Sequence, residues 1–385
     1  MQTISFLWYE PPIFFYILVI APVTYLAYRA WSLALGQPRA GLRAALLTLA
    51  FAVLDLVVLS GTRWLGWAYP AVMVPYLGLT LSRLVPVLIF SLPASKAARL
   101  GRPHPNFPRW VLPALGALYL CGSLLLAYSI YIEPYRIQVS QVSLPGPGAA
   151  VGQPLRIVHI TDLHIGPISS RETDMIAKVN ALQPDLILLT GDYLFVNTSS
   201  DPQGWENLRT VLSQLQARYG IYAVAGSPMA DQPLIDNNFF ASVDNVTLLD
   251  DAVQPFLFPD GLLYLVGVTN IEIGRDTAAL EHLMADIPPE AYTILLYHVP
   301  TLASAAAETG VDLFLAGHTH GWQVDLPPVQ WVYSLYMPYS RGQDQLGDTT
   351  IYVNRGIGLE SIYLPGVRLL CPPEILLLEI SPAVR

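Results

Sequence analysis

The chain has 385 residues, 53% of them hydrophobic and only 13% charged, which is too apolar for one ordinary soluble domain. Residues 1–132 carry nine Lys or Arg and two acidic residues, whereas residues 133–385 carry 11 Lys or Arg and 27 acidic residues. The acidic part is a poor non-specific binder of nucleic acid, so no nucleic-acid partner is expected, and the two cysteines, Cys121 and Cys371, cannot make a cysteine-based metal site.

Four apolar stretches of the first part are long enough to cross a bilayer as helices. They lie at about residues 12–31, 42–60, 68–93 and 110–132. Lys and Arg concentrate in the linkers after the first and third stretches, so the positive-inside rule places these linkers in the cytoplasm. We therefore expect residues 1–132 to be a multi-pass cell-membrane anchor, with both of its ends outside and the acidic part of the chain extracytoplasmic.

Two ionisable residues, Asp55 and Arg83, fall inside the second and third expected spans, at similar depths from the cytoplasmic side. Isolated charges at such depths are costly. We expect an ion pair that holds two helices together; a substrate or ion path is the alternative.

Residues 133–154 are expected to be a linker with a short edge strand in "YRIQVSQVSL", ended by the turn-rich "PGPG". From residue 155 to residue 385, apolar runs alternate with helical patterns. Strands are expected at 155–160, 185–190, 220–226, 263–268, 292–297, 312–316, 350–354 and 374–380, and helices at 171–182, 204–218, 276–285 and 300–310. This alternation predicts a layered α/β domain with the helices outside the sheets.

Asp and His residues directly follow several of the expected strands. They are Asp162 and His164, Asp192, His298, and the pair His318 and His320. Residues two apart in an extended segment point the same way, so Asp162 and His164 can bind one ion together. Donors of this kind hold transition metals, and two metals ~3.5–4 Å apart can clamp a phosphoryl group and activate a water. The pattern predicts metal-assisted hydrolysis of a phosphate ester.

The motifs "ITDLHIG", "LLTGDY" and "LAGHTHGWQ" resemble, in their order and spacing, those of calcineurin-like metallophosphoesterases, and the resemblance covers about residues 155–380. The downstream "IYVNRGIG" and "CPPEILLLEI" resemble the membrane-associated bacterial subgroup. The resemblance implies a pair of packed mixed sheets flanked by helices. We therefore expect a four-layer α/β/β/α metallophosphoesterase domain over residues 155–385, after a four-helix transmembrane region.

By the same resemblance, two divalent ions such as Mn, Fe or Zn would be bound. Asp162, His164 and His320 would bind the first ion, Asp192 would bridge, and His298 and His318 would bind the second. Arg355, in "NRGIG", would contact the substrate phosphate; a structural salt bridge is the alternative.

One motif departs from the family pattern. Where the family has Gly-Asn-His-Asp/Glu, this chain has Gly226-Ser227-Pro228-Met229. Ser227 would offer a weaker hydroxyl ligand to the second metal, and Pro228 cannot replace the histidine that acts as the acid. Such an acid contributes roughly 10²–10⁴-fold to the rate. Asp231 is near enough in sequence for a shifted loop to bring its carboxylate into the site; an acidic residue of a surface loop is the alternative.

We therefore expect a membrane-anchored, metal-dependent phosphoesterase that uses a metal-activated hydroxide. Its substrate would be a phosphomonoester, phosphodiester or pyrophosphate, with a lipid or envelope phosphate as one candidate. The alternative is a catalytically impaired pseudoenzyme that serves as a membrane-tethered binding or scaffold protein.

Overall fold

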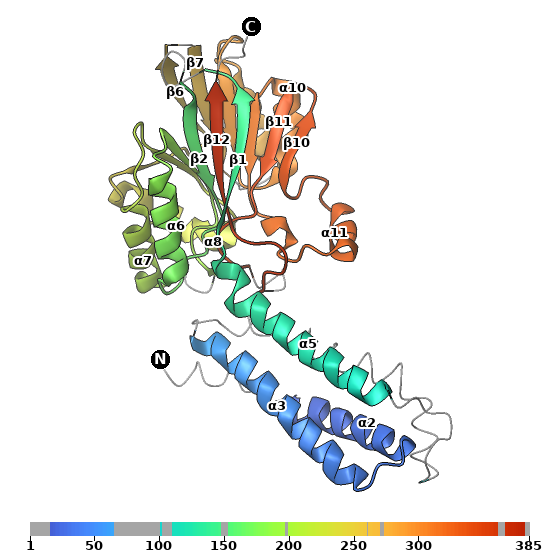
Figure 1. Ribbon diagram of the computed structural model, residues 1–385. Helices are drawn as coiled ribbons and strands as arrows, with labels where there is room; N and C mark the ends of the chain where they lie inside the picture. Colours follow the sequence, from blue (N-terminus) through green and yellow to red (C-terminus); the bar gives the residue numbers. More distant parts are fainter. Residues whose placement is uncertain are drawn as a thin grey trace. The chain divides into compact units, whose positions relative to one another are not determined.

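The computed structural model describes residues 16–64, 101, 110–147, 153–196, 199–259, 261–269, 273–360 and 366–381 (Figure 1). The chain divides into two compact units. One comprises residues 1–132 and 361–367, and the other comprises residues 133–360 and 368–385.

The described part of the first unit is helical. A π-helical turn, η1 (Tyr16–Ile20), leads into α2 (Ala21–Ala34), and α3 (Ala40–Trp64) and α5 (Val111–Tyr131) follow. An aromatic cluster joins the three helices, because the ring of Tyr28 stacks on Phe51 and meets the edge of Tyr119 at 6.0 Å. Asp55 is fully buried, and the Ser123 hydroxyl of α5 donates a hydrogen bond to its carboxylate at 2.9 Å. The expected partner of Asp55, Arg83, lies outside the described residues.

Two helical segments in the described part of the chain are long and apolar enough to cross a membrane, Ala40–Val58 and Gly116–Tyr135. They correspond to the expected spans at 42–60 and 110–132. The expected span at 12–31 is described only from Tyr16, and the one at 68–93 lies outside the described residues. The four-helix anchor therefore stays a prediction.

The second unit contains two six-stranded sheets. The first has the order β1 (Gln138–Pro145), β12 (Glu374–Ser381), β2 (Leu155–Ile160), β3 (Leu186–Thr190), β4 (Ile221–Val224), β5 (Val246–Leu248). The second has the order β10 (Gly342–Leu346), β11 (Thr349–Val353), β9 (Leu313–Ala316), β8 (Tyr292–Leu296), β7 (Gly261–Gly267), β6 (Ala252–Phe258). Only the pairs β12·β2, β10·β11 and β6·β7 are antiparallel, so both sheets are mixed. The prediction of a mixed α/β domain is confirmed.

Side chains that alternate along each central strand face two different parts of the core, one between the two sheets and one between a sheet and its helices. In β2, Ile157 packs with residues of the other sheet such as Ile294, whereas Val158 packs with residues of helices such as Met175. The helices packed on the first sheet are α6 (Ser170–Ala181), α7 (Pro202–Leu212) and α8 (Pro228–Asp236), and those on the second are α9 (Ile273–Met284) and α10 (Ala303–Thr309). Strands buried on both faces explain the uninterrupted apolar runs of the sequence.

The loops contain the remaining short helices. They are η2 (Glu133–Tyr135), η4 (Phe239–Ser242), η5 (Pro300–Leu302), η6 (His320–Trp322) and α11 (Pro327–Ser334). Figure 1 shows α11 standing off from the sheets, beside the segment that leads into β10. The parallel strands β2, β3, β4, β8 and β9 all point their carboxyl ends towards these loops, which is where α/β proteins place their sites.

Candidate metal centre

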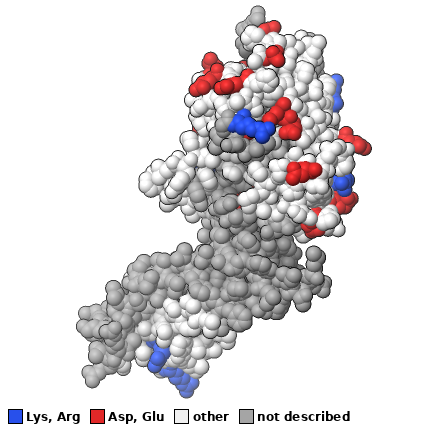
Figure 2. Space-filling view, turned by 180° about the vertical axis from the view of Figure 1, so that it is seen from behind, with Lys and Arg blue, Asp and Glu red and all other residues white. Residues whose placement is uncertain are grey.

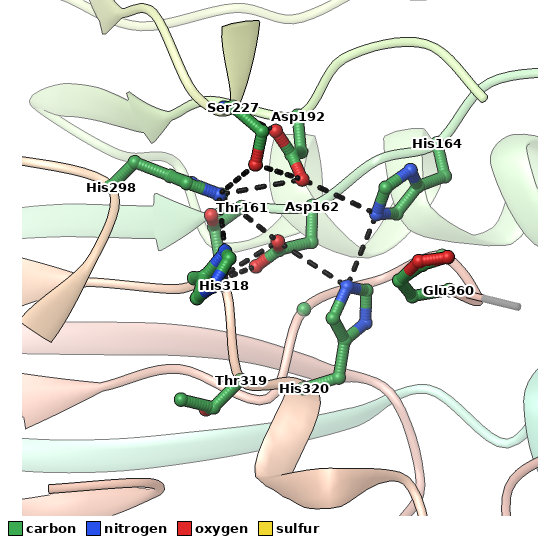
Figure 3. Close-up of polar contacts among 12 residues, drawn as sticks. Thr161, Asp162, His164, Asp192, Ser227, His298, His318, Thr319, His320 and Glu360 are labelled. Atoms are coloured by element: carbon green, nitrogen blue, oxygen red, sulfur yellow. Dashed lines mark hydrogen bonds and ion pairs between the residues drawn. The ribbon is translucent and has the colours of Figure 1, made fainter. Parts of the chain in front are cut away.

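Six Asp and His side chains converge where strands of the two sheets end (Figure 3). Asp162 and His164 follow β2, Asp192 follows β3, His298 follows β8, and His318 and His320 follow β9. All the expected metal ligands among Asp and His are thus brought to one place.

The backbone is unusual at five of these six residues. Asp162, His164, Asp192, His318 and His320 have left-handed backbone conformations, with φ between 42° and 70°. A side chain in such a conformation costs of order 1–3 kcal/mol and persists only where its surroundings enforce it. The loops therefore aim these side chains at the expense of local stability, as functional sites do.

Close approach of neighbouring backbone keeps the side chains in place. A Cβ atom at Gly317 would collide with the carboxylate of Asp162, and one at Gly226 would collide with the backbone nitrogen of Asp192. The loops that contain Gly317 and Gly226 can therefore pack this closely against Asp162 and Asp192 only because glycine occupies these two positions.

The first group of possible ligands is Asp162, His164 and His320, all buried, whose donor atoms lie within 4.8 Å of one another. The Nε2 atom of His320 lies 3.1 Å from Nε2 of His164 and 3.3 Å from Oδ1 of Asp162. Three donors from two sheets therefore face a common point.

The second group is Asp192, His298 and His318, whose donor atoms also lie within 4.8 Å of one another. The Nε2 atom of His298 lies 3.4 Å from Oδ2 of Asp192 and 3.2 Å from Nδ1 of His318. The same Oδ2 atom lies 3.8 Å from Nε2 of His164, so Asp192 stands between the two groups.

The donor set suits divalent transition metals, because it offers imidazole nitrogen and carboxylate oxygen and no sulfur. His298 shows how one ligand is oriented. Its Nδ1–H donates to the carbonyl of Thr190 at 2.6 Å, so in the neutral ring Nε2 carries the lone pair that faces the group.

Comparison with known proteins agrees with this geometry. Residues 155–322 match the family described as calcineurin-like phosphoesterase. These residues form a calcineurin-like metallophosphoesterase domain. Members of the family hydrolyse phosphate esters with divalent metal ions.

Three relatives share this domain. Metallophosphoesterase YkuE of Bacillus subtilis is 27% identical over 278 residues, which cover 68% of this chain and 91% of that protein. Phosphodiesterase YaeI of Escherichia coli is 28% identical over 236 residues, which cover 59% and 82%. A bovine protein named "transmembrane protein with metallophosphoesterase domain" is 31% identical over 225 residues, which cover 52% of this chain but only 48% of that protein.

The metallophosphoesterase domain concentrates opposite charges at its donor groups. Burial alone lowers the pKa of His298, but the carboxylates of Asp192 and Asp162 outweigh burial and raise that pKa to about 10. In return, His298 and His164 hold the pKa of Asp192 well below its usual range despite burial. Burial raises the pKa of Asp162 to about 6 and lowers that of His318 to about 4.

Ser227 of the phosphoesterase domain lies beside the second group. Its backbone N–H donates to Oδ1 of Asp192 at 2.6 Å, its hydroxyl donates to Oδ2 of Asp192 at 3.2 Å, and the same hydroxyl lies 3.4 Å from Nε2 of His298. The serine hydroxyl therefore lies within reach of two donor residues of the second group. Pro228 is the first residue of α8 and brings no proton donor.

Asp231 neither enters the metal centre nor lies on the surface, so both alternatives for it are wrong. Its buried carboxylate accepts hydrogen bonds from the backbone N–H groups of Asp192 at 2.8 Å, Tyr193 at 3.0 Å and Gly226 at 2.7 Å. It therefore ties the loop after β3 to the loop after β4 and fixes the backbone on which Asp192 stands.

Arg355 forms the salt bridge that was the alternative to phosphate binding. Its Nε and Nη2 atoms each lie 3.2 Å from a carboxylate oxygen of Glu374, and its backbone N–H donates to the same group. The contact with a substrate phosphate remains a prediction, because the Arg355 side chain is still 18% exposed.

Two further residues of the centre were missed by the sequence analysis. Arg368 is fully buried and donates to the carbonyls of Arg355, Gly356, Gly358 and Cys371, and so holds the loop that packs against Asp162 and His164. A charged residue within the apolar run "GVRLLC" was the available signal. Glu360, which Figure 3 places near His164 and His320, is held through its backbone by the side-chain amide of Gln323.

Proposed function

We propose that this chain is a membrane-anchored phosphoesterase that hydrolyses a phosphomonoester, phosphodiester or pyrophosphate. The observation that carries the proposal is the pair of three-residue donor groups with Asp192 between them. Two divalent ions held there would clamp a phosphoryl group and lower the pKa of a water between them.

Each residue has a proposed role. Asp162, His164 and His320 would hold the first ion, and Asp192 would bridge. His298, His318 and the hydroxyl of Ser227 would hold the second ion. Arg355, at the rim, is the proposed contact for the phosphate oxygens, and the domain is proposed to have the four-layer α/β/β/α order of its family.

We further propose that the anchor has four helices, that the domain is extracytoplasmic, and that the chain belongs to the membrane-associated bacterial subgroup. Support for the anchor and its orientation comes from the two apolar helices, from the basic linkers, and from the printed name of the bovine relative. The printed name of the Escherichia coli relative supports a phosphodiester among the substrates. A lipid or envelope phosphate is the proposed substrate class.

The second candidate function is a catalytically impaired pseudoenzyme that acts as a membrane-tethered binding or scaffold protein. The replacement of Asn-His by Ser227-Pro228 favours it, because the family's proton donor is lost. The intact donor groups favour the enzyme.

The test is hydrolysis of bis-p-nitrophenyl phosphate and p-nitrophenyl phosphate by the full chain in detergent with Mn²⁺. Asp192→Asn should lower turnover on the order of 100-fold or more, because it removes the proposed bridge between the ions. Glu206→Gln, on the exposed face of α7, is the matched control and should behave as the unmodified chain. If Asp192→Asn and the unmodified chain have equal turnover, the proposal of an enzyme is wrong and the pseudoenzyme is the remaining candidate.

A further inference from the structure

The segment between β9 and β10 contains an exposed surface without charge. Residues 326–340, "LPPVQWVYSLYMPYS", include no Lys, Arg, Asp, Glu or His. The exposed fractions of four large apolar side chains in it are 67% for Trp331, 44% for Val332, 68% for Leu335 and 80% for Tyr336. We call this set the α11 surface. A contiguous apolar surface of this kind marks an interaction site, unlike scattered single residues.

The segment that carries the α11 surface is hydrogen bonded to the loop that contains His318 and His320. The side-chain amide of Gln330 donates to the carbonyls of Gly321 and Val324, both at 3.1 Å, and the hydroxyl of Thr319 donates to the carbonyl of Ser340 at 2.6 Å. An ion pair between Asp325 and Arg341 closes the base of the segment. The segment is therefore held at both ends by the loop that carries His318 and His320.

Its chemistry suits one partner above others, the interface of a phospholipid bilayer. Trp and Tyr prefer that interface, where an apolar ring body meets a polar edge. Charge supports the same partner. The remainder of residues 133–385 is strongly acidic and would be repelled by an anionic lipid surface, whereas the α11 surface is uncharged and the two charges at its base neutralise each other. In Figure 2, the view from behind, α11 forms an uncoloured lobe beside red and blue patches.

The length of the tether also favours a bilayer. Six residues separate the end of α5 at Tyr131 from the start of β1 at Gln138. A fully extended chain of six residues spans at most about 20 Å. If α5 crosses the membrane, the domain is thus held close to the surface, where even weak binding to lipid is saturated by the high effective concentration.

We propose that the α11 surface docks into the bilayer interface and so presents the metal centre to phosphate esters of amphiphiles in that bilayer. This inference rests on the proposed membrane anchor but not on catalytic activity. Apolar faces of interfacial helices lie roughly 5–10 Å into the boundary between headgroups and acyl chains. Trp331, Leu335 and Tyr336 are the residues that enter.

The test is spin-label accessibility in the full chain reconstituted in phosphatidylcholine–phosphatidylglycerol vesicles. Cys121→Ala removes the exposed native thiol, and Cys371 is fully buried. The label is placed by Trp331→Cys or, independently, by Leu335→Cys. Leu257→Cys is the matched control, because Leu257 is an 82% exposed leucine on β6, at the opposite edge of the second sheet from β10.

The measured quantity is the ratio of the label's collision rate with oxygen to its collision rate with a water-soluble nickel complex. This ratio should be on the order of five times higher for a label at residue 331 or 335 than for a label at residue 257. Equal ratios in a chain that floats with the vesicles overturn the docking surface while leaving the anchor standing. A chain that does not float overturns both. Dipolar coupling between labels of two copies, without contact to lipid, assigns the α11 surface to a protein interface and also overturns the proposal.

Discussion

At the metal centre, the identity of the donor residues could be predicted from the sequence, but their backbone conformation and their supporting residues could not. The donors could be predicted, because Asp and His that directly follow buried strands lie at the carboxyl ends of those strands, where α/β proteins place their sites. The left-handed backbone of Asp162, His164 and His320 could not be predicted, because only the surrounding loops enforce it. Asp231 and Arg368 also escaped prediction of their roles, since both act on backbone groups that no motif records.

His298 is the residue through which the centre responds to pH. Its pKa of about 10 means that the metal-free ring carries a proton at neutral pH, held by Asp192 and Asp162. An ion in the second group must displace that proton, so affinity for Mn²⁺ should rise with pH. The rise should be about tenfold per pH unit where one proton is released.

Isothermal titration calorimetry at pH 6, 7 and 8, in two buffers of different ionisation enthalpy, measures both the affinity and the released proton. Mn²⁺ binding at the second group that releases no proton and does not strengthen with pH would contradict this role for His298. Asp192→Asn should lower the affinity at every pH and is the comparison variant.

Among the elements, buried strands could be predicted and polar or interrupted ones could not. The runs 185–190 ("DLILLT") and 312–316 ("DLFLA") are apolar except at their ends and appear as β3 and β9. By contrast, β6 contains Pro255 and β10 reads "GQDQL" with an exposed face, so neither carries the apolar pattern of a strand. The helix expected at 204–218 is shorter, Pro202–Leu212, and α8 and α11 were not expected.

Helix α8 begins where the family resemblance predicts an Asn-His pair, and the two residues at its start, Ser227 and Pro228, can be mutated. The double variant Ser227→Asn/Pro228→His should add an amide ligand beside His298 and a proton donor near the phosphate. Turnover of bis-p-nitrophenyl phosphate should rise at least roughly tenfold, at the low end of what an acid contributes.

The control is Ser227→Ala/Pro228→Ala, which replaces the same two residues at the start of α8 but restores neither the amide ligand nor the proton donor. An increase shared by the two double variants would attribute the effect to loosening of the helix. Unchanged turnover and unchanged Mn²⁺ stoichiometry in the Asn-His variant would show that the Ser-Pro sequence is no defect.

The whole molecule joins an apolar part to an acidic domain, and this division could be predicted because it rests on composition alone. The orientation across a membrane is the prediction that belongs to this scale. With Cys121→Ala as background, a membrane-impermeant maleimide should label Leu257→Cys in intact cells. Pro38→Cys, in the linker between α2 and α3, should be labelled only after permeabilisation, because the Arg-rich linker is expected in the cytoplasm. The reverse pattern would place the domain inside.

Strands β1 and β12 are hydrogen bonded in parallel along their whole length, from Gln138 with Glu374 to Pro145 with Ser381. During synthesis, β1 emerges directly after α5, yet β12, its only partner in the described sheet, follows more than two hundred residues later. A pairing of such large sequence separation forms late, because its loop-closure entropy is repaid only once the intervening elements are in place. Strand β1 therefore stays without its partner strand until the rest of the domain has been synthesised.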